Sequence, residues 1–267
     1  MNDNIKRCLK NVVSLDGWIG EFADEGKANV HVDVVFRDAL FGDKPDHTVT
    51  FKLTLKRAEV FLLVGDDDPI KVVRSTIRRT VSDATISQKQ ESTVEQSGKA
   101  RAGGKVSKLG VPGHASTEGE INASKKTTNS SKQAIREYVV QHFVDGANPA
   151  WDVSRHDGKP MGGAPWDANH EPRLKVKRKP PAGSNEQLAI KLELRCRRQD
   201  LVISEIAFID PKKKSLFNTG KFQTQKLVAA EQVIKDELSD SGLLTNGDLS
   251  KDAVTLLIAD TIIFEED

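Results

Sequence analysis

The sequence predicts a mostly β, β-sandwich-like fold with a long central amphipathic β-hairpin or extended arm and one C-terminal α-helix. Three observations support this fold class. Several segments alternate apolar and polar residues with a period of two, which is typical of half-buried strands. Turn-forming residues separate these segments at intervals of roughly 8–15 residues, as in sandwich proteins. One segment near the C-terminus has the apolar spacing of a helix that packs on a sheet.

Residues 1–80 are expected to form the N-terminal β half of the sandwich. The segments "ANVHVDVVF" (28–36) and "HTVTFKLTLKR" (47–57) place large apolar residues on one face and polar residues on the other. "AEVFLLV" (58–64) is continuously apolar, as in a strand covered on both faces, and the turn signal "GDDDP" follows it. In "NVVSLDGWIGEF" we predict a short strand with a turn at Asp16-Gly17.

Residues 134–267 are expected to form the C-terminal β half, in one composite domain with the first half. The segment 134–144 is assigned to a strand because it is rich in β-branched residues. Residues 145–172 are predicted to form a long structured loop or two very short strands.

The cleanest strand pattern of the chain is "NEQLAIKLELRCRR" (185–198), and we predict a hairpin turn after it at Gln199-Asp200. An apolar stripe predicts a helix over residues 223–241, with Gly242 as its stop. The apolar segment 253–264 is most simply a buried strand that returns to the sheet.

Residues 81–133 differ from both halves, because Ser, Thr, Gly, Lys, Glu and Ala dominate there. The small residues of this segment keep alternate positions in two arms, 98–106 and 115–123. In antiparallel pairing they share one face, and a basic arm lies opposite an acidic arm, which favours pairing by a few tenths of a kcal/mol per pair. The predicted membrane or assembly face of this hairpin consists of Ala100, Ala102, Val106, Leu109, Val111, Ala115, Ile121 and Ala123.

Three interpretations of residues 81–133 remain open at this point. The composition is that of a disordered linker, although a linker has no reason to keep the alternation through two arms. An ordered hairpin can instead pack its small-residue face on the β domain or on a partner chain. A third interpretation is a hairpin that rearranges into a membrane, because arms of this length match the 9–11 residues that a transmembrane strand needs.

The alternation, the Ser/Thr/Gly-rich composition and the apolar tip at Leu109 and Val111 resemble the insertion hairpins of oligomeric β-pore-forming toxins such as the aerolysin-like group. The resemblance is one of pattern and covers only this part of the chain. It implies oligomerisation and insertion into a membrane. The sequence departs from a membrane barrel in that its apolar face is mostly Ala, Gly and Thr and no aromatic girdle flanks it.

Two loops carry candidate metal ligands. The acidic turn that contains Asp66, Asp67 and Asp68 can supply oxygen ligands to calcium. Separately, the loop region after Trp151 contains Asp152 and His156 among carboxylates and imidazoles that can bind a metal or carry out acid–base chemistry. The alternative is that these residues are solvated turn residues, since no recognised ligand spacing is present. Trp151 and Trp166 are interpreted as core or loop-anchoring residues rather than as a ligand cage.

Catalytic motifs for nucleotide binding, phosphoryl transfer or serine hydrolysis are absent from the sequence, so we expect no enzyme activity and no cofactor. The net charge of +1 gives no global field that attracts nucleic acid or an anionic membrane. The basic segments 173–181 and 210–215 can touch phosphate groups, but they contain no aromatic residue for base stacking, so nucleic acid is not an expected partner.

The expected function is that of a non-enzymatic, self-assembling β protein whose central hairpin mediates oligomerisation and membrane insertion in the manner of a pore former. The alternative is a soluble structural or partner-binding module with a flexible or strand-adding arm. The expected partners are further copies of the chain, membrane lipid or another protein. Two distant cysteines, no signal peptide and no long apolar run predict a cytoplasmic location that still permits membrane association.

Overall fold

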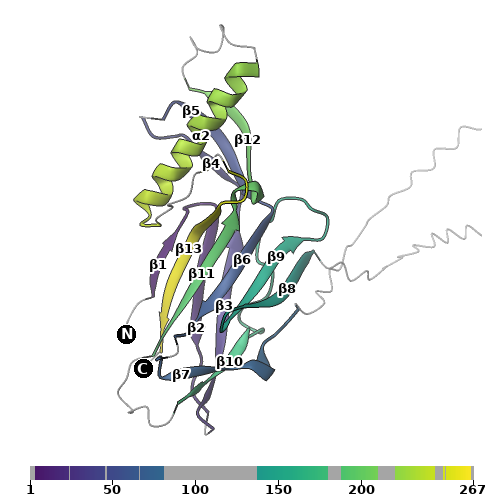
Figure 1. The fold of residues 1–267 in the computed structure, drawn as a ribbon, viewed down its shortest axis with the longest axis vertical. Helices are drawn as coiled ribbons and strands as arrows, with labels where there is room; N and C mark the ends of the chain where they lie inside the picture. The colour runs from purple at the N-terminus through teal and green to yellow at the C-terminus, as the bar shows by residue number, and fades with distance from the viewer. Residues whose placement is uncertain are drawn as a thin grey trace, which may run out of the picture. The chain divides into compact units, whose positions relative to one another are not determined.

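The computed structural model describes residues 4–23, 25–45, 47–65, 67–80, 137–179, 188–209, 220–243, 249 and 251–265. These residues form three antiparallel sheets and one α-helix, which confirms the predicted mostly β, sandwich-like class (Figure 1). The predicted hairpin and its face lie outside the described residues.

The largest sheet has six strands and takes them from both sides of residues 81–133. β6 precedes that segment, yet it lies between β11 and β9, which follow it. The two predicted halves therefore share one sheet. The strand order is β1 (Ile5–Cys8), β13 (Thr255–Phe264), β11 (Ala189–Arg197), β6 (Arg57–Leu63), β9 (Asn148–Arg155) and β8 (Tyr138–Asp145).

The two smaller sheets also combine strands from both halves. The four-stranded sheet has the order β2 (Val13–Ile19), β3 (Lys27–Phe36), β10 (Leu174–Arg178) and β7 (Ile70–Val73). The three-stranded sheet has the order β12 (Leu201–Phe208), β5 (Val49–Leu55) and β4 (Ala39–Phe41). Helix α2 (Gly220–Asp240) packs on β12 and β5 of this last sheet (Figure 1).

The core follows from the alternation in the sequence. Along β3, burial alternates at every residue, so that its even-numbered apolar side chains lie in the core and its odd-numbered side chains face outward. An added Cβ at Gly17 of β2 would lie 2.9 Å from Leu192 of β11, which places the four-stranded sheet directly against the six-stranded one. Each fully buried side chain of this kind contributes about 1.5–3 kcal/mol to the folded state.

The predicted turn at Asp16-Gly17 is wrong, because β2 runs through both residues. Asp16 pairs with Asp33, and Gly17 pairs with Val32 in the ladder between β2 and β3. Glycine is needed here for close packing, since a Cβ would lie 2.7 Å from the carbonyl oxygen of His31. The Asp-Gly pair therefore reflects a close approach of backbones and not a reversal of the chain.

Two further predictions about connections are wrong. Residues 145–172 contain the eight-residue strand β9, which the turn-forming residues around it obscure. The residues at Gln199-Asp200 form a short 3-10 helix, η2 (Arg198–Asp200), and no hairpin turn. Because η2 redirects the chain, β12 pairs with β5 in the three-stranded sheet, whereas β11 stays in the six-stranded sheet.

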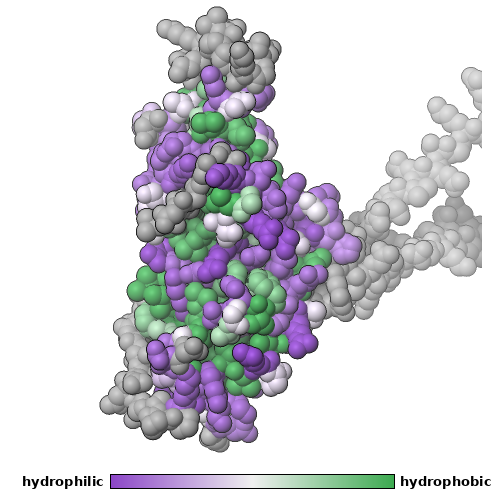
Figure 2. All heavy atoms as spheres, viewed as in Figure 1, coloured by the Kyte–Doolittle hydropathy of each residue, from purple (hydrophilic) through white to green (hydrophobic). Residues whose placement is uncertain are grey.

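The predicted helix is confirmed, with a start at Gly220 in place of residue 223. Its predicted stop is also confirmed. Gly242 has a φ of +72°, and the amide of Leu243 donates to the carbonyl of Leu238 at 2.8 Å, which is the bond that closes a Schellman cap. Figure 2 shows that hydrophobic residues on the visible face are interrupted by hydrophilic ones, with no single continuous apolar surface.

The close packing at Gly17 gives a prediction about stability. Gly17→Ala is expected to lower the free energy of unfolding by about 1–3 kcal/mol, because the new methyl group meets backbone at 2.7 Å. Gly20→Ala is the matched control, since its Cβ would have no neighbour closer than 3.8 Å. Urea unfolding of both variants checks this, and equal stability of the two would contradict the packing described.

A second prediction concerns the facing carboxylates of β2 and β3. Burial, and then the charge of Asp16, raise the pKa of Asp33. Burial also acts to raise the pKa of Asp16, but its bonds to Lys6, Asn4 and the Gly17 amide lower it overall. An acid with a raised pKa destabilises the folded state once it ionises, so Asp33→Asn is expected to stabilise the protein at neutral pH by about 0.5 kcal/mol.

The gain from Asp33→Asn should be absent below pH ~4 and should appear as the pH rises through the pKa of Asp33 in the folded state. Asp16→Asn is expected to have the opposite sign, because the ionised Asp16 is held by its partners. Thermal unfolding of both variants across pH checks the two signs. A loss of stability in both variants would contradict the like-charge account.

Candidate functional site

Residues 81–136, which we call the central segment, lie in the chain between edge strands of two different sheets. Before them, the chain leaves β7 through a short 3-10 helix, η1 (Arg74–Thr76), and after them it enters β8. β7 is the last strand of the four-stranded sheet, and β8 is the last strand of the six-stranded sheet. Among the described strands, each has a partner on one side only. The contacts that hold these two attachment points, at Arg78 and Tyr138, form the candidate site.

Arg78 fixes the point where the chain leaves the sandwich. Its amide donates to the carbonyl oxygen of Arg173 at 2.8 Å. Its own carbonyl oxygen accepts two bonds, one from the indole Nε1 of Trp151 at 2.8 Å and one from Nη2 of Arg173 at 3.1 Å. Its side chain pairs with Glu171 at 3.0 Å. We call Arg78, Trp151, Trp166, Glu171 and Arg173 the root cluster.

Arg173 is the centre of the root cluster, and its side chain is fully buried. The guanidinium carbon lies 4.5 Å from the ring centroid of Trp166 and 5.4 Å from that of Trp151, so two indoles contact the cation. Burial lowers the pKa of Arg173 to about 10, and the nearby Arg78 contributes to the lowering while Glu171 opposes it. Arg173 is therefore still charged at neutral pH, inside the core.

The two tryptophans of the root cluster are positioned by a strand and by a loop. Trp151 lies in β9, where alternation turns its ring inward, and Trp166 lies in the loop between β9 and β10, where its Nε1 donates to the carbonyl of Val32 at 2.6 Å. Both rings are buried, which confirms the expectation that they are core or loop-anchoring residues. The indole–guanidinium stack thus joins β9, this loop and the entry to β10.

The same loop also anchors the point where the chain returns. The Tyr138 hydroxyl, at the start of β8, donates to the carbonyl of Gly162 at 2.7 Å and lies 3.0 Å from the amide nitrogen of Gly162, from which it accepts. The amide of His156 donates to the carbonyl of Glu137 at 3.1 Å. Burial lowers the pKa of His142 in β8, aided by the charges of Arg79 and Arg173. The loop therefore holds both ends of the central segment.

The predicted metal ligands do not come together. Asp66 lies outside the described residues, and Asp68 accepts a bond from the amide of Gly65. Asp152 is paired with Arg57 at 2.6 Å and lies opposite Glu59 in the sheet, away from the turn that follows β6. Across the described ranges, no three His, Cys, Asp or Glu side chains are grouped as a metal site.

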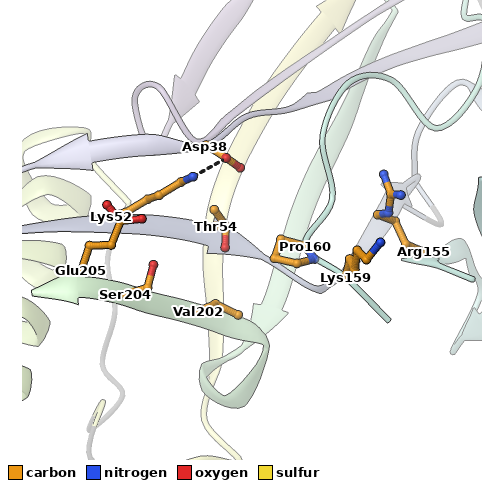
Figure 3. Close-up of a pocket in the computed structure, with 9 residues that line it drawn as sticks. All are labelled: Asp38, Lys52, Thr54, Arg155, Lys159, Pro160, Val202, Ser204 and Glu205. Atoms are coloured by element: carbon orange, nitrogen blue, oxygen red, sulfur yellow. Dashed lines mark ion pairs between the residues drawn. The ribbon is translucent and has the colours of Figure 1, made fainter. Parts of the chain in front are cut away.

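A polar pocket of about 330 Å³ lies between the three-stranded sheet and the start of the β9–β10 loop (Figure 3). Lys52 points toward Asp38, with which it pairs at 2.7 Å, and Arg155 and Lys159 both pair with Asp157, at 3.0 and 3.4 Å. Its lining cations are therefore already matched by acids. The lining residues are Asp38, Lys52, Thr54, Arg155, Lys159, Pro160, Val202, Ser204 and Glu205.

The predicted face of the hairpin, from Ala100 to Ala123, lies outside the described residues, so its role stays a prediction. Sequence reasoning did not identify Arg78 and Arg173, because both occur in charged segments that are typical of solvated surfaces. The only sequence signal for this cluster was the pair Trp151 and Trp166, whose large rings needed an anchor in a loop region.

Comparisons with known proteins do not assign the chain to a family. No protein-family profile and no curated protein sequence matches the chain. Among solved structures, the NetB toxin of Clostridium perfringens in its membrane-inserted form matches with 13% sequence identity and a TM-score of 0.25, over 72% of this chain and 84% of that one. A TM-score of this size does not establish a shared fold. No helix within the described ranges is long and apolar enough to cross a bilayer.

The root cluster leads to a prediction about local opening. Trp151→Phe keeps a ring beside Arg173 but removes the donor to the Arg78 carbonyl, so we expect faster hydrogen exchange at the amides of Arg78 and Arg79. Trp166→Phe is the matched control, since it also removes one indole bond, to Val32. Each variant should lose about 1–3 kcal/mol of stability. Equal acceleration at Arg78 in both variants would contradict a specific anchor.

Proposed function

We propose that the protein is a non-enzymatic, self-assembling β protein, in which residues 81–133 form an arm that pairs with strands of further copies. The described residues hold the chain at Arg78 before the arm and at Tyr138 after it, where the edge strand β8 begins. The anchoring of both attachment points, one of them on an edge strand, is the observation that carries the proposal. An edge strand offers unpaired backbone groups to an incoming strand, which is the basis of strand addition.

The sequence of the arm supports pairing of this kind. Its small residues share one face, and its basic and acidic arms are complementary. β8 itself also suits an interface, since Val144 near its end is 53% exposed although it is apolar. A surface of this kind is stabilised when a second strand covers it.

Insertion into a membrane is the further part of the proposal. Two arms with alternating small and polar residues provide one face for lipid and one for water, once several copies close a ring with no free edge. The alternative, a soluble module whose arm augments the sheet of a different protein, uses the same edge and the same alternation. Assembly state and vesicle leakage separate these outcomes.

The test uses the parity of the arm. Insertion of one residue after Gly104 turns every later side chain to the opposite face, whereas insertion of two residues keeps the faces. We expect the purified full chain to form oligomers in sedimentation velocity, the one-residue insertion to abolish them and the two-residue insertion to retain them. Equal assembly of both insertion variants, or a wild-type chain that is monomeric at every accessible concentration with and without vesicles, would overturn the proposal.

Dye release from phosphatidylcholine–phosphatidylserine vesicles tests the membrane part. We expect the wild-type protein to release the dye and Ile121→Lys, which places a charge on the predicted lipid face, to stop the release without loss of assembly. Ser116→Lys, on the opposite face of the same arm, is the matched control and should leave release unchanged. Oligomers that leave vesicles sealed would contradict insertion and retain the assembly proposal.

A further inference from the structure

The outer face of the four-stranded sheet carries a row of lysines on three adjacent strands. In the register of β3, β10 and β7, Lys177 lies opposite Lys27 on one side and opposite Lys71 on the other. Lys175 lies one step further along the same face of β10. Directly opposed residues in an antiparallel sheet project from the same face, so four ammonium groups share this surface. We call these four residues the lysine face.

Among the described residues, the acid that offsets the charges of the lysine face is Glu25. It pairs with Lys27, its side chain is 72% exposed, and Lys177 and Lys175 also help to lower its pKa. Within the described part of the chain, Lys71, Lys175 and Lys177 have no ion-pair partner. Like charges directly opposite one another destabilise a sheet, and neighbouring strands are only about 4.8 Å apart. The repulsion between these lysines therefore works against folding.

A flat row of lysines matches a surface that presents many phosphate groups in one plane. Asn29 and Val73 lie on either side of Lys175 on this face, so no aromatic ring lies directly beside the four lysines for stacking on a base. The nearest ring pair, Trp18 and His31, stacks on itself with centroids 4.8 Å apart, which occupies a face of each ring. These features favour lipid headgroups over a nucleic acid.

We propose that the lysine face binds the surface of a membrane that contains anionic phospholipids, with headgroup phosphates against the ammonium groups. The binding surface is already formed, because each of its strands is paired in the sheet (Figure 1). It also lies close to the point where the central segment begins, since the amide of Lys175 donates to the hydroxyl of Thr76 in η1 at 2.8 Å. Arg78, the anchor of that segment, follows two residues later.

The test compares two triple variants with the same change in net charge. Lys71→Gln/Lys175→Gln/Lys177→Gln is expected to weaken binding of the full chain to phosphatidylcholine–phosphatidylserine vesicles by about 100-fold. The control is Lys10→Gln/Lys56→Gln/Lys251→Gln, three exposed lysines outside this face, and it should change binding less than threefold or so. Vesicle co-sedimentation gives both values, and high salt should abolish the binding of the wild-type protein.

Several outcomes would overturn the proposal: equal weakening by the two triple variants, equal binding of the wild type to pure phosphatidylcholine vesicles, or binding of single-stranded or duplex DNA in place of vesicles. If the triple variant unfolds, Lys177→Gln alone removes the centre of the row and is expected to weaken binding about fivefold. The result is independent of the assembly proposal, since the one-residue insertion after Gly104 should still bind vesicles through this face.

Discussion

The contacts of the buried Arg173 guanidinium hold together the part of the sandwich from which the central segment leaves. A charge in the core costs several kcal/mol unless it is compensated, and here the compensation comes from separate elements. Trp151 of the six-stranded sheet and Trp166 of the β9–β10 loop contact the cation. The backbone carbonyl of Arg78, in the chain that leaves the four-stranded sheet, accepts a bond from it, and the negative charge of Glu171 in the loop favours its charged form. Each indole–guanidinium contact contributes about 2 kcal/mol when it is desolvated. The cation is therefore stable only while all three elements stay in place.

The chain is anchored on both sides of the central segment. Arg78 is held before the segment and Tyr138 after it, and both bond to the β9–β10 loop or to a residue at its end. The described partners of both attachment points lie in the sandwich itself, because β7 pairs with β10 and β8 pairs with β9. Under the proposed assembly, the sandwich is the constant part of the molecule and the arm is the part that changes partners.

Period-two alternation made most of the strands predictable, since burial in β3 follows it at every residue and burial in β11 departs from it at the charged Glu193. Gly242 was predictable for a different reason, because many helices end on a residue with a positive φ and glycine adopts that conformation without strain. The errors arose where one residue type serves two purposes. Gly17 marks a close backbone approach rather than a turn, and a buried arginine looks like a solvated one. Which sheet a strand joins, as for β12, depends on long-range pairing that no local pattern contains.

The lysine face and the arm act at different stages under these proposals. The lysine face is built on paired strands, so it can bind a surface without any rearrangement. The repulsion between its lysines is already present in the free protein, so binding does not add it. Pairing of arms requires two or more chains and therefore depends steeply on concentration. Chains held on one membrane have a much higher effective concentration than chains in solution. Surface binding through Lys27, Lys71, Lys175 and Lys177 thus favours assembly at the membrane over assembly in solution, although no residue of the lysine face belongs to the arm.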